Sequence, residues 1–326
     1  MIISRAPFRV SFCGGGSDIP AFYEKYGGAV VSTSIKKYMY LCLNPSFDSH
    51  QIALKYSQTE IVDDPSKIDH KIFRQVLSDF GIRGVEITSM ADISAGTGLG
   101  SSSTFTVALL KLLYTYQGRY ASNYKIAKEA CEVEINKLGH PIGKQDQFAA
   151  AFGGLKYYEF QPDGFVKVEP IVMHKDSYAK MQENLLMFYT GKLHSADAIL
   201  AEQTKSLESE NEKIEATKRL VELAKELKAK LEDNNIDALG DCLKANWEIK
   251  RTLAKGITNP LVDESYQKAM AAGAKGGKLL GAGGGGFLLF YANEESDRQR
   301  IRAALPELRE SKFELDQAGC SIVFME

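Results

Sequence analysis

The segment that most constrains this chain of 326 residues is a loop rich in glycine and serine. Residues 94–103 read Ser-Ala-Gly-Thr-Gly-Leu-Gly-Ser-Ser-Ser, with glycine at every second position of the centre. Apolar residues then recur at spacings of four, three and four, which predicts one face of a helix; they are Phe105, Leu109, Leu112 and Tyr116. A glycine-rich loop before a helix offers free backbone N–H groups and the positive end of the helix dipole. The sequence therefore predicts a phosphate-binding loop with a nucleoside triphosphate as its ligand.

Other phosphate-binding loops have different spacings. A Walker loop requires Lys after its last glycine, but Ser101 follows Gly100. The dinucleotide motif requires G-x-G-x-x-G, whereas Gly96, Gly98 and Gly100 form G-x-G-x-G. The His-Arg-Asp and Asp-Phe-Gly triplets of protein kinases do not occur in the sequence. The alternative is a flexible turn before an ordinary helix, so the loop needs support from other motifs.

The composition excludes several classes of partner. Hydrophobic residues make up 44% of the chain, charged residues 25%, and the formal net charge is −2, so there is no basic field for nucleic acid or an anionic membrane. The first residues do not resemble a signal peptide, and no apolar stretch is long enough to span a bilayer. Five dispersed cysteines without a C-x-x-C pair suit a reducing compartment. We therefore expect a cytoplasmic protein without nucleic-acid or membrane partners, and the sequence leaves a homodimer open.

Hydrophobic patterns divide the chain into a first half rich in strands and a second half rich in helices. In the first half, strands are expected over 1–13, 28–43 (as a β pair), 52–56 and 84–89, and helices over 66–80 and 122–138. In the second half, helices are expected over 195–233, 237–254, 260–272 and 295–304, and strands over 276–291 and 318–325. The sequence thus predicts an α+β protein of two domains, 1–172 and 173–326.

Two further glycine-rich segments accompany the phosphate loop. In residues 5–18, three glycines follow the first strand and precede Ser17 and Asp18; Asp18 can accept hydrogen bonds from sugar hydroxyls or cap a helix at 19–26. Arg9 lies inside that strand, where it must pair with a carboxylate or reach a ligand. Residues 278–286 read Lys-Leu-Leu-Gly-Ala-Gly-Gly-Gly-Gly. Glycine gains no packing in a strand, so this segment indicates either the close approach of a ligand or backbone, or a long turn.

Carboxylates between residues 132 and 146 are candidates for catalysis. Glu132 and Glu134 are two residues apart on an expected helix and therefore face different directions. Asp146 lies in Gly-Lys-Gln-Asp-Gln-Phe, where polar residues beside small apolar ones predict one wall of a cleft. A solvated helix start is the alternative interpretation of the same residues.

Taken in order, the three glycine-rich segments resemble the three motifs of the GHMP superfamily of kinases, named for galactokinase, homoserine kinase, mevalonate kinase and phosphomevalonate kinase. Residues 5–18, 94–103 and 278–286 match the first, second and third motif. The resemblance implies a ribosomal-protein-S5-like N-terminal domain and a ferredoxin-like C-terminal domain, with ATP and substrate between them. The phosphate loop departs from the family pattern because Ser94 replaces its usual proline.

The resemblance also implies roles for individual residues. ATP would bind the phosphate loop at Gly96, Gly98, Leu99, Gly100, Ser101, Ser102 and Ser103. Mg²⁺ would be held by Ser102 and Glu134, which suits an ion that prefers few protein oxygens plus phosphate oxygens. Asp146 would be the catalytic aspartate, and Arg9 the cation beside the transferred phosphoryl group. The sugar would be bound by Gly15, Gly16, Ser17, Asp18, Gly283 and Gly284.

Details of the motifs favour one branch of the superfamily. Galactokinases carry Gly-Glu-His-Thr-Asp where this chain has Gly-Gly-Gly-Ser-Asp. Cys-Gly-Gly-Gly-Ser-Asp, Gly-Lys-Gln-Asp-Gln-Phe and Leu-Leu-Gly-Ala-Gly-Gly-Gly-Gly-Phe resemble D-glycero-D-manno-heptose 7-phosphate kinases, which phosphorylate the anomeric hydroxyl in the synthesis of nucleotide-activated heptose. The alternatives are an L-fucokinase-like enzyme, a non-catalytic sugar- or nucleotide-binding regulator, and a mevalonate diphosphate decarboxylase.

A substrate that already carries phosphate requires a cationic pocket. Spacing alone does not choose among five candidates: Lys144, Lys156, Lys192, Arg74 and Arg83. We favour Lys192, because it follows Thr190 and Gly191 where the expected helices of the second half begin.

Overall fold

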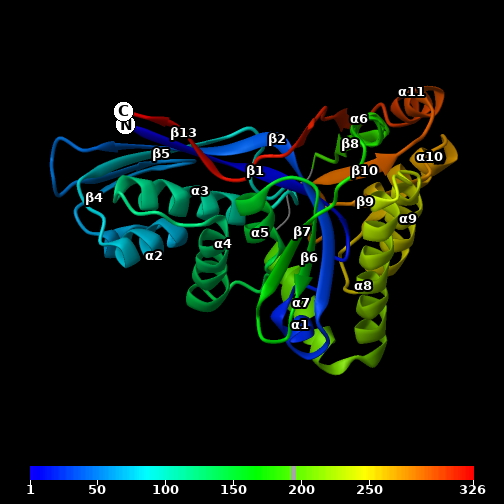
Figure 1. Cartoon of the computed structure of the whole chain (residues 1–326), viewed down its shortest axis with the longest axis horizontal. Helices are drawn as coiled ribbons and strands as arrows, with labels where there is room; N and C mark the ends of the chain where they lie inside the picture. Colours follow the sequence, from blue (N-terminus) through cyan, green and yellow to red (C-terminus); the bar gives the residue numbers. More distant parts are fainter. Residues whose placement is uncertain (192–195) are drawn as a thin grey trace.

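The computed structural model describes residues 1–191 and 196–326, which form two sheets and layers of helices (Figure 1). The strands of the larger sheet are β1 (Ile2–Cys13), β2 (Gly28–Pro45), β3 (Ile52–Lys55), β4 (Thr59–Val62), β5 (Val85–Ala91), β6 (Lys156–Phe160), β7 (Val166–Pro170), β12 (Leu315–Asp316) and β13 (Ser321–Met325). The strands of the smaller sheet are β8 (Leu185–Tyr189), β9 (Gly276–Leu279), β10 (Phe287–Tyr291) and β11 (Arg309–Glu310). This mixture confirms the predicted α+β class.

The helices lie mainly in the middle and second half of the chain. They are α1 (Pro20–Tyr26), α2 (Lys71–Phe80), α3 (Ser101–Tyr116), α4 (Asn123–Cys131), α5 (Gln145–Phe152), α6 (Lys175–Glu183), α7 (Ala196–Ser209), α8 (Asn211–Glu232), α9 (Ala238–Lys250), α10 (Pro260–Ala271) and α11 (Glu295–Ala304), with short helical turns η1 (Pro65–Lys67) and η2 (Glu132–Lys137). Among the described helices, none combines the length and apolar character needed to cross a bilayer.

The long strand β2 organises the larger sheet, and the prediction of a β pair over 28–43 was wrong. Residues 28–45 form one strand, because the segment contains no glycine or proline between its ends at which a turn could form. The strand β1 pairs antiparallel with β2 along most of its length, while β6 joins the first part of β2 and β5 the last part. The β1–β2 ladder shifts register between Pro7 and Arg9 and again between Ser11 and Cys13.

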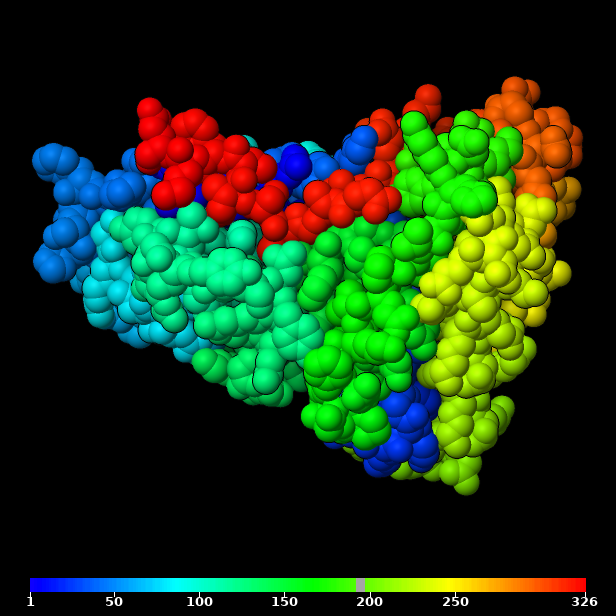
Figure 2. Space-filling view, in the orientation of Figure 1, coloured from blue at the N-terminus to red at the C-terminus, as the bar shows by residue number. Residues whose placement is uncertain are grey.

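The C-terminal strands return to the larger sheet. The strand β13 pairs antiparallel with β1, and β12 pairs with β2. The two ends of the chain therefore lie side by side (Figure 1). The amino group of Met1 donates a hydrogen bond to the carbonyl of Glu326 (3.1 Å). In Figure 2 the C-terminal segment lies across the surface formed by earlier parts of the chain. The boundary between domains at residues 172 and 173 stays a prediction.

The helix α3 packs at the centre of the first half, against β1 and β2 on one side and α4 and α5 on another. The prediction of a single apolar face was wrong, because Leu110 and Leu113 are buried as completely as Leu109 and Leu112. Thr104 and Thr106 are buried too, and their hydroxyls donate to carbonyls one turn earlier in the helix. A helix enclosed on most sides holds its N-terminus in a fixed position.

Two other expected elements are interrupted. The helix expected over 122–138 consists of α4, capped by the Ser122 hydroxyl as predicted, and then the π-helical turn η2. The strand expected over 276–291 consists of β9 and β10, which pair with each other across the loop 280–286. Helix α9 packs on β9, so its last residue, Lys250, lies near the start of that loop.

Candidate active site

The three glycine-rich segments meet around one cavity of about 760 Å³. It is lined by most of the residues predicted for the site, drawn from β1, the turn after it, the loop 94–100, α3 and α5. These residues are Arg9, Gly15, Gly16, Asp18, Gly96, Gly98, Gly100, Ser101, Ser102, Ser103 and Asp146. The fold therefore brings together segments that are far apart in the sequence.

Other predicted residues lie behind the cavity wall. Leu99 is fully buried, and its carbonyl accepts a hydrogen bond from the backbone N–H of Arg9 (3.4 Å). The buried Ser17 hydroxyl donates to the carbonyl of Gly14 (2.7 Å) and braces the turn. In the third segment, the cavity is lined by Gly281 and Ala282, whereas Gly283 and Gly284 pack on Ile257. Lys192 lies outside the described residues.

The N-terminus of α3 opens onto the cavity. Gly100 precedes the helix with a φ of 80°, and no side chain caps the first turn. The first N–H groups of an α-helix have no acceptor within the helix, and Ser101, Ser102 and Ser103 supply these groups here. Such N–H groups, together with the helix dipole, are suited to binding phosphate oxygens.

The phosphate loop and the third glycine segment touch at Gly98 and Gly281. Gly98 has a φ of 83°, and a Cβ atom on it would lie 2.7 Å from the carbonyl oxygen of Leu280. A side chain at this position would therefore force the two loops apart. The close approach of another backbone explains these glycines, as one of the two interpretations of residues 278–286 predicted.

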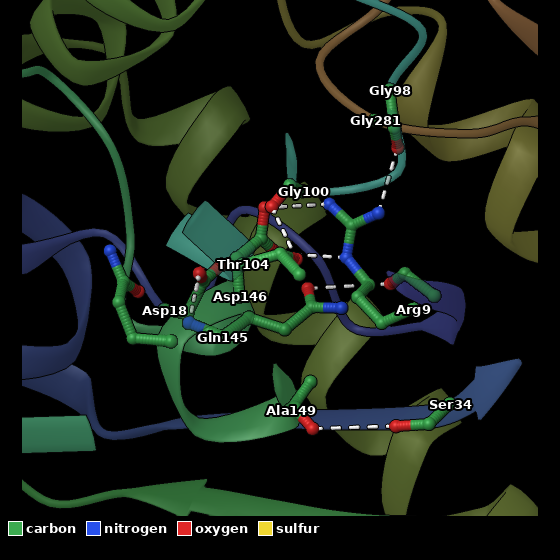
Figure 3. A network of polar contacts seen from close by, with 12 residues as sticks. Arg9, Asp18, Ser34, Gly98, Gly100, Thr104, Gln145, Asp146, Ala149 and Gly281 are labelled. Carbon is green, nitrogen blue, oxygen red and sulfur yellow. Dashed lines mark hydrogen bonds and ion pairs between the residues drawn. The ribbon is translucent and has the colours of Figure 1, made fainter. Parts of the chain in front are cut away.

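Arg9 and Asp146 form a bidentate ion pair in the cavity wall (Figure 3). The Nε and Nη2 atoms of Arg9 donate to the two carboxylate oxygens of Asp146 at 2.7 and 2.8 Å, and Nη1 donates to the carbonyl of Gly98 at 2.7 Å. The register shifts on both sides of Arg9 change the course of β1 locally, which is how an irregular ladder redirects a side chain. The pair fixes the Asp146 carboxylate beside the phosphate loop, with about a quarter of its side chain exposed.

Glu134 lies directly behind Ser102 and is fully buried. Its Oε1 accepts a hydrogen bond from the Ser102 hydroxyl (2.6 Å), and its Oε2 accepts one from the Gln147 side chain (2.8 Å). Burial raises the pKa of Glu134 to about 7, although these hydrogen bonds oppose the shift. Glu132 faces solvent, so the prediction that the two glutamates face different directions is confirmed.

The turn after β1 and the start of α5 form a polar end of the cavity. The buried Asp18 carboxylate accepts hydrogen bonds from the backbone N–H groups of Gly16 (2.9 Å) and Gln145 (3.1 Å), and burial raises its pKa. A Cβ atom on Gly143 would overlap this carboxylate, so glycine is required there. Gln145 also lines the cavity, and its buried Nε2 has no partner among the described residues. Gly143 and Gln145 belong to the motif Gly-Lys-Gln-Asp-Gln-Phe, which was expected to form one wall of a cleft, but sequence reasoning assigned neither of them an individual role.

Two family models match the chain. The model for the GHMP kinases N terminal domain matches residues 69–154, and the model for the GHMP kinases C terminal domain matches residues 223–310. The chain belongs to the GHMP kinase family. It is therefore an ATP-dependent phosphotransferase with a hydroxyl group as acceptor.

Individual relatives agree with this membership. The chain is 27% identical over 94% of both lengths to D-glycero-alpha-D-manno-heptose 7-phosphate kinase of Campylobacter jejuni subsp. jejuni. It is also 27% identical to the bifunctional fucokinase/GDP-fucose pyrophosphorylase of Arabidopsis thaliana, covering 92% of this chain but 31% of that protein. The crystal structure of a D-glycero-D-manno-heptose 1-phosphate kinase from Bacteroides thetaiotaomicron shares the fold, with a TM-score of 0.81 and 24% identity over 100% of both chains.

In contrast to the polar end formed by Asp18 and Gln145, another part of this GHMP kinase cavity is apolar. It is lined by apolar and aromatic side chains from several elements: Met39, Tyr56, His70, Ile72, Met90, Ile93 and Phe105. The rings of His70 and Phe105 lie 5.1 Å apart between centroids, and burial lowers the pKa of His70. A flat apolar ligand such as a nucleobase fits these surroundings. Sequence reasoning missed this group because no local motif connects its members.

Within the part of the chain that the structure describes, four of the five candidates for a phosphate-binding cation in this GHMP kinase do not line the cavity: Lys144, Lys156, Arg74 and Arg83. Arg83 pairs with Asp64, and Arg74 donates to the carbonyl of Ile68. Lys144 donates to the carbonyl of Gly164, and Lys156 also lies away from the cavity lining. The lysines among its described lining residues are instead Lys250 and Lys278.

Proposed function

We propose that this GHMP kinase transfers the γ-phosphoryl group of ATP, with Mg²⁺, to the anomeric hydroxyl of D-glycero-D-manno-heptose 7-phosphate. The product is the 1,7-bisphosphate, an intermediate toward nucleotide-activated heptose, and the reaction takes place in the cytoplasm. The observation that carries the chemistry is the Arg9–Asp146 pair beside the open N-terminus of α3. The choice of sugar is supported by the full-length similarity to the Campylobacter heptose 7-phosphate kinase.

ATP would lie with its triphosphate at the phosphate loop and its base at the apolar end of the cavity. The first-turn N–H groups of α3 would donate to the phosphate oxygens. The apolar lining around Tyr56, His70 and Phe105 would enclose the adenine. In this arrangement ATP would span the cavity, and its γ-phosphate would lie toward Asp146.

The oxygens of Ser102 and Glu134 fit a Mg²⁺ ion. They are hard ligands 2.6 Å apart beside the phosphate site, and the buried Glu134 carboxylate has no cationic partner among the described residues. When bound, Mg²⁺ neutralises charge on the phosphate oxygens. Gln147 holds the Glu134 carboxylate in place through its other oxygen.

Asp146 would accept the proton of the attacking hydroxyl. In the transfer, the anomeric oxygen forms a bond to the γ-phosphorus, the bond from the γ-phosphorus to the β–γ bridging oxygen breaks, and ADP leaves. Arg9 would balance the charge that moves across the phosphoryl group, since its guanidinium has donors left beyond the three already used. Asp18 and the Nε2 of Gln145 would bind sugar hydroxyls at the polar end.

The proposal is tested by ATP consumption with Mg²⁺ against a panel of acceptors. The panel holds D-glycero-D-manno-heptose 7-phosphate, sedoheptulose 7-phosphate, mannose 6-phosphate, L-fucose, galactose and mevalonate, with products located by ³¹P NMR. We expect a new anomeric phosphate on the heptose phosphate. Turnover of L-fucose alone would move the enzyme to the fucokinase branch, and ATP binding without turnover of any acceptor would favour the regulator.

A further inference from the structure

Two lysines, the buried Lys278 and the partly buried Lys250, line the cavity without a role in the transfer described above. Lys250 ends α9, and Lys278 lies in β9, the strand on which α9 packs. Lys278 is 2% exposed, although it lines the cavity. Long cationic side chains seldom lie at such depth without a charged partner, so their position requires an explanation.

Both lysines donate only to backbone carbonyls. The Nζ of Lys278 donates to the carbonyl of Phe12 (3.1 Å), at the end of β1. The Nζ of Lys250 donates to the carbonyls of Leu279 (3.1 Å) and Gly281. An ammonium group has three N–H donors, so two remain on Lys278 and one on Lys250. Among the described residues, no carboxylate lies within ion-pair distance of either Nζ.

The electrostatics of the pair favour an incoming anion. Burial lowers the pKa of Lys278 to about 8 and that of Lys250 well below its usual value, and the charges on Lys278 and Arg9 lower the pKa of Lys250 further. Lys250, Lys278 and Arg9 line the same cavity, while Asp146 is already paired with Arg9. An anion between the lysines would offset their mutual repulsion and their cost of burial.

We propose that Lys250 and Lys278 form the site that binds the phosphate group already present on the sugar substrate. This inference rests on the proposed function, because it names the protein groups that would distinguish a sugar phosphate from a free sugar. It assigns this role to residues that the sequence did not suggest, and it does not depend on Lys192, which lies outside the described residues.

The elements that carry the two lysines indicate that they bind the sugar phosphate rather than ATP. The donors suited to the triphosphate come from the loop 94–100 and α3, whereas the lysines come from α9 and β9. Lys278 contacts the end of β1, directly before the turn that carries Gly15, Gly16 and Asp18. Lys278 therefore adjoins the part of the cavity assigned to the sugar, and Lys250 lies beside the loop 280–286 that follows the strand of Lys278.

The test uses Lys250→Met and Lys278→Met, which keep the length of the side chain and remove its charge. The KM for D-glycero-D-manno-heptose 7-phosphate should rise about 10- to 100-fold in each variant, the range set by loss of a charge-assisted hydrogen bond. The KM for the unphosphorylated heptose and the Kd for ATP should change less than about 2-fold, since neither uses the site. Lys244→Met, on the exposed side of the same helix, should match the wild type.

Binding of inorganic phosphate with the ATP site filled by a non-hydrolysable analogue provides a second measurement, by calorimetry. The wild type should bind phosphate and both variants should bind it more weakly. An unchanged KM and unchanged phosphate binding in folded variants would overturn the site while leaving the proposed function intact. A raised Kd for ATP with an unchanged KM for the sugar phosphate would also overturn it, because the lysines would then serve the nucleotide. Phosphate binding that depends on both lysines, in a wild type that phosphorylates no sugar phosphate, would overturn the proposed function instead.

Discussion

Asp146 and Glu134 are two carboxylates close to the N-terminus of α3, and the protein treats them differently. Asp146 is held by a bidentate bond from Arg9 and remains partly exposed to the cavity. Glu134 is fully buried, accepts hydrogen bonds from the neutral side chains of Ser102 and Gln147, and has its pKa raised to about 7 by burial. Among the described residues, Asp146 thus has a cationic partner, Arg9, whereas Glu134 has none.

The negative charge of Asp146 is balanced by the protein itself at all times, whereas that of Glu134 is balanced only when a cation binds. A carboxylate with a protein cation keeps its position whether or not ligands are present. A buried carboxylate without one is costly until a cation arrives from solution. We infer that the Asp146 side of the site is prepared for the acceptor hydroxyl in advance, whereas the Glu134 side is completed by the metal that accompanies ATP.

The largest effect is expected for Asp146→Asn. The amide keeps the shape but cannot take the proton of the acceptor, so kcat should fall at least about 100-fold while ATP still binds. Steady-state kinetics and ATP titration would measure the two effects, with Asp176→Asn on the exposed face of α6 as a control. Turnover within about 3-fold of the wild type would remove Asp146 from the chemistry.

Glu134→Gln should raise the stability of the free protein and at the same time impair its use of Mg²⁺. The Glu134 pKa is about 7 in the folded protein and 4.5 without the fold, so its contribution to stability is present below pH 4.5 and is lost as the pH rises to about 7. At pH 8 without ligands, the variant should be more stable than the wild type by about 1 to 3 kcal/mol, and it should need far more Mg²⁺.

Urea unfolding at pH 5 and pH 8 measures this difference. The excess of the variant's free energy of unfolding over that of the wild type should be smaller at pH 5, where the wild-type Glu134 carboxyl is protonated. Glu132→Gln, on the exposed side of the same turn, provides the matched control. A gain that is equal at both pH values would show that Glu134 titrates normally in the folded protein.

The Mg²⁺ requirement of the wild type should depend on pH. Protons compete with Mg²⁺ for Glu134, so the free Mg²⁺ needed for half-maximal rate should rise up to about 10-fold per pH unit below pH 7. Initial rates at controlled free Mg²⁺ between pH 6 and pH 8 test this, and Glu134→Gln corrects for protonation of ATP itself. A flat profile in the wild type would contradict the assignment of Glu134 as a metal ligand.

The smallest effect is expected for Ser102→Ala. Loss of one neutral oxygen ligand should raise the Mg²⁺ requirement about 3- to 10-fold, with little change in the Kd for ATP measured without metal. The same Mg²⁺ titration provides the measurement, and Ser78→Ala on the exposed side of α2 is the control. If the requirement does not move, Ser102 only anchors Glu134 through its hydrogen bond.

The residues that sequence reasoning identified are those whose constraints are local. The phosphate loop could be predicted because alternating glycines before a helix leave few conformations, and Arg9 because a charged residue stands out inside a strand. Asp146 could be singled out because its polar motif resembles that of the GHMP kinases. The structure brings these residues together, and their chemical roles remain predictions. The π-helical turn at Glu134 carries no comparable local signal, whereas the lack of glycine and proline between the ends of residues 28–45 is a local signal for the single strand β2.

What the sequence could not predict depends on contacts between distant elements. Tyr56, His70 and Phe105 come from separate elements, and each resembles an ordinary core residue by itself. Lys250 reads as the polar end of an amphipathic helix, and Lys278 as one residue before a glycine loop. Only the packing of α9 on β9 places the two lysines on one cavity.

The pairing of β13 with β1 has a consequence for folding during synthesis. Arg9 lies on β1, which emerges from the ribosome before the other strands of its sheet, whereas β13 emerges after all of them. Until then one edge of β1 is open, and an open edge can pair with another chain. Nascent chains stalled before β13 should therefore be the most aggregation-prone species of this protein, although they already contain every residue of the proposed active site.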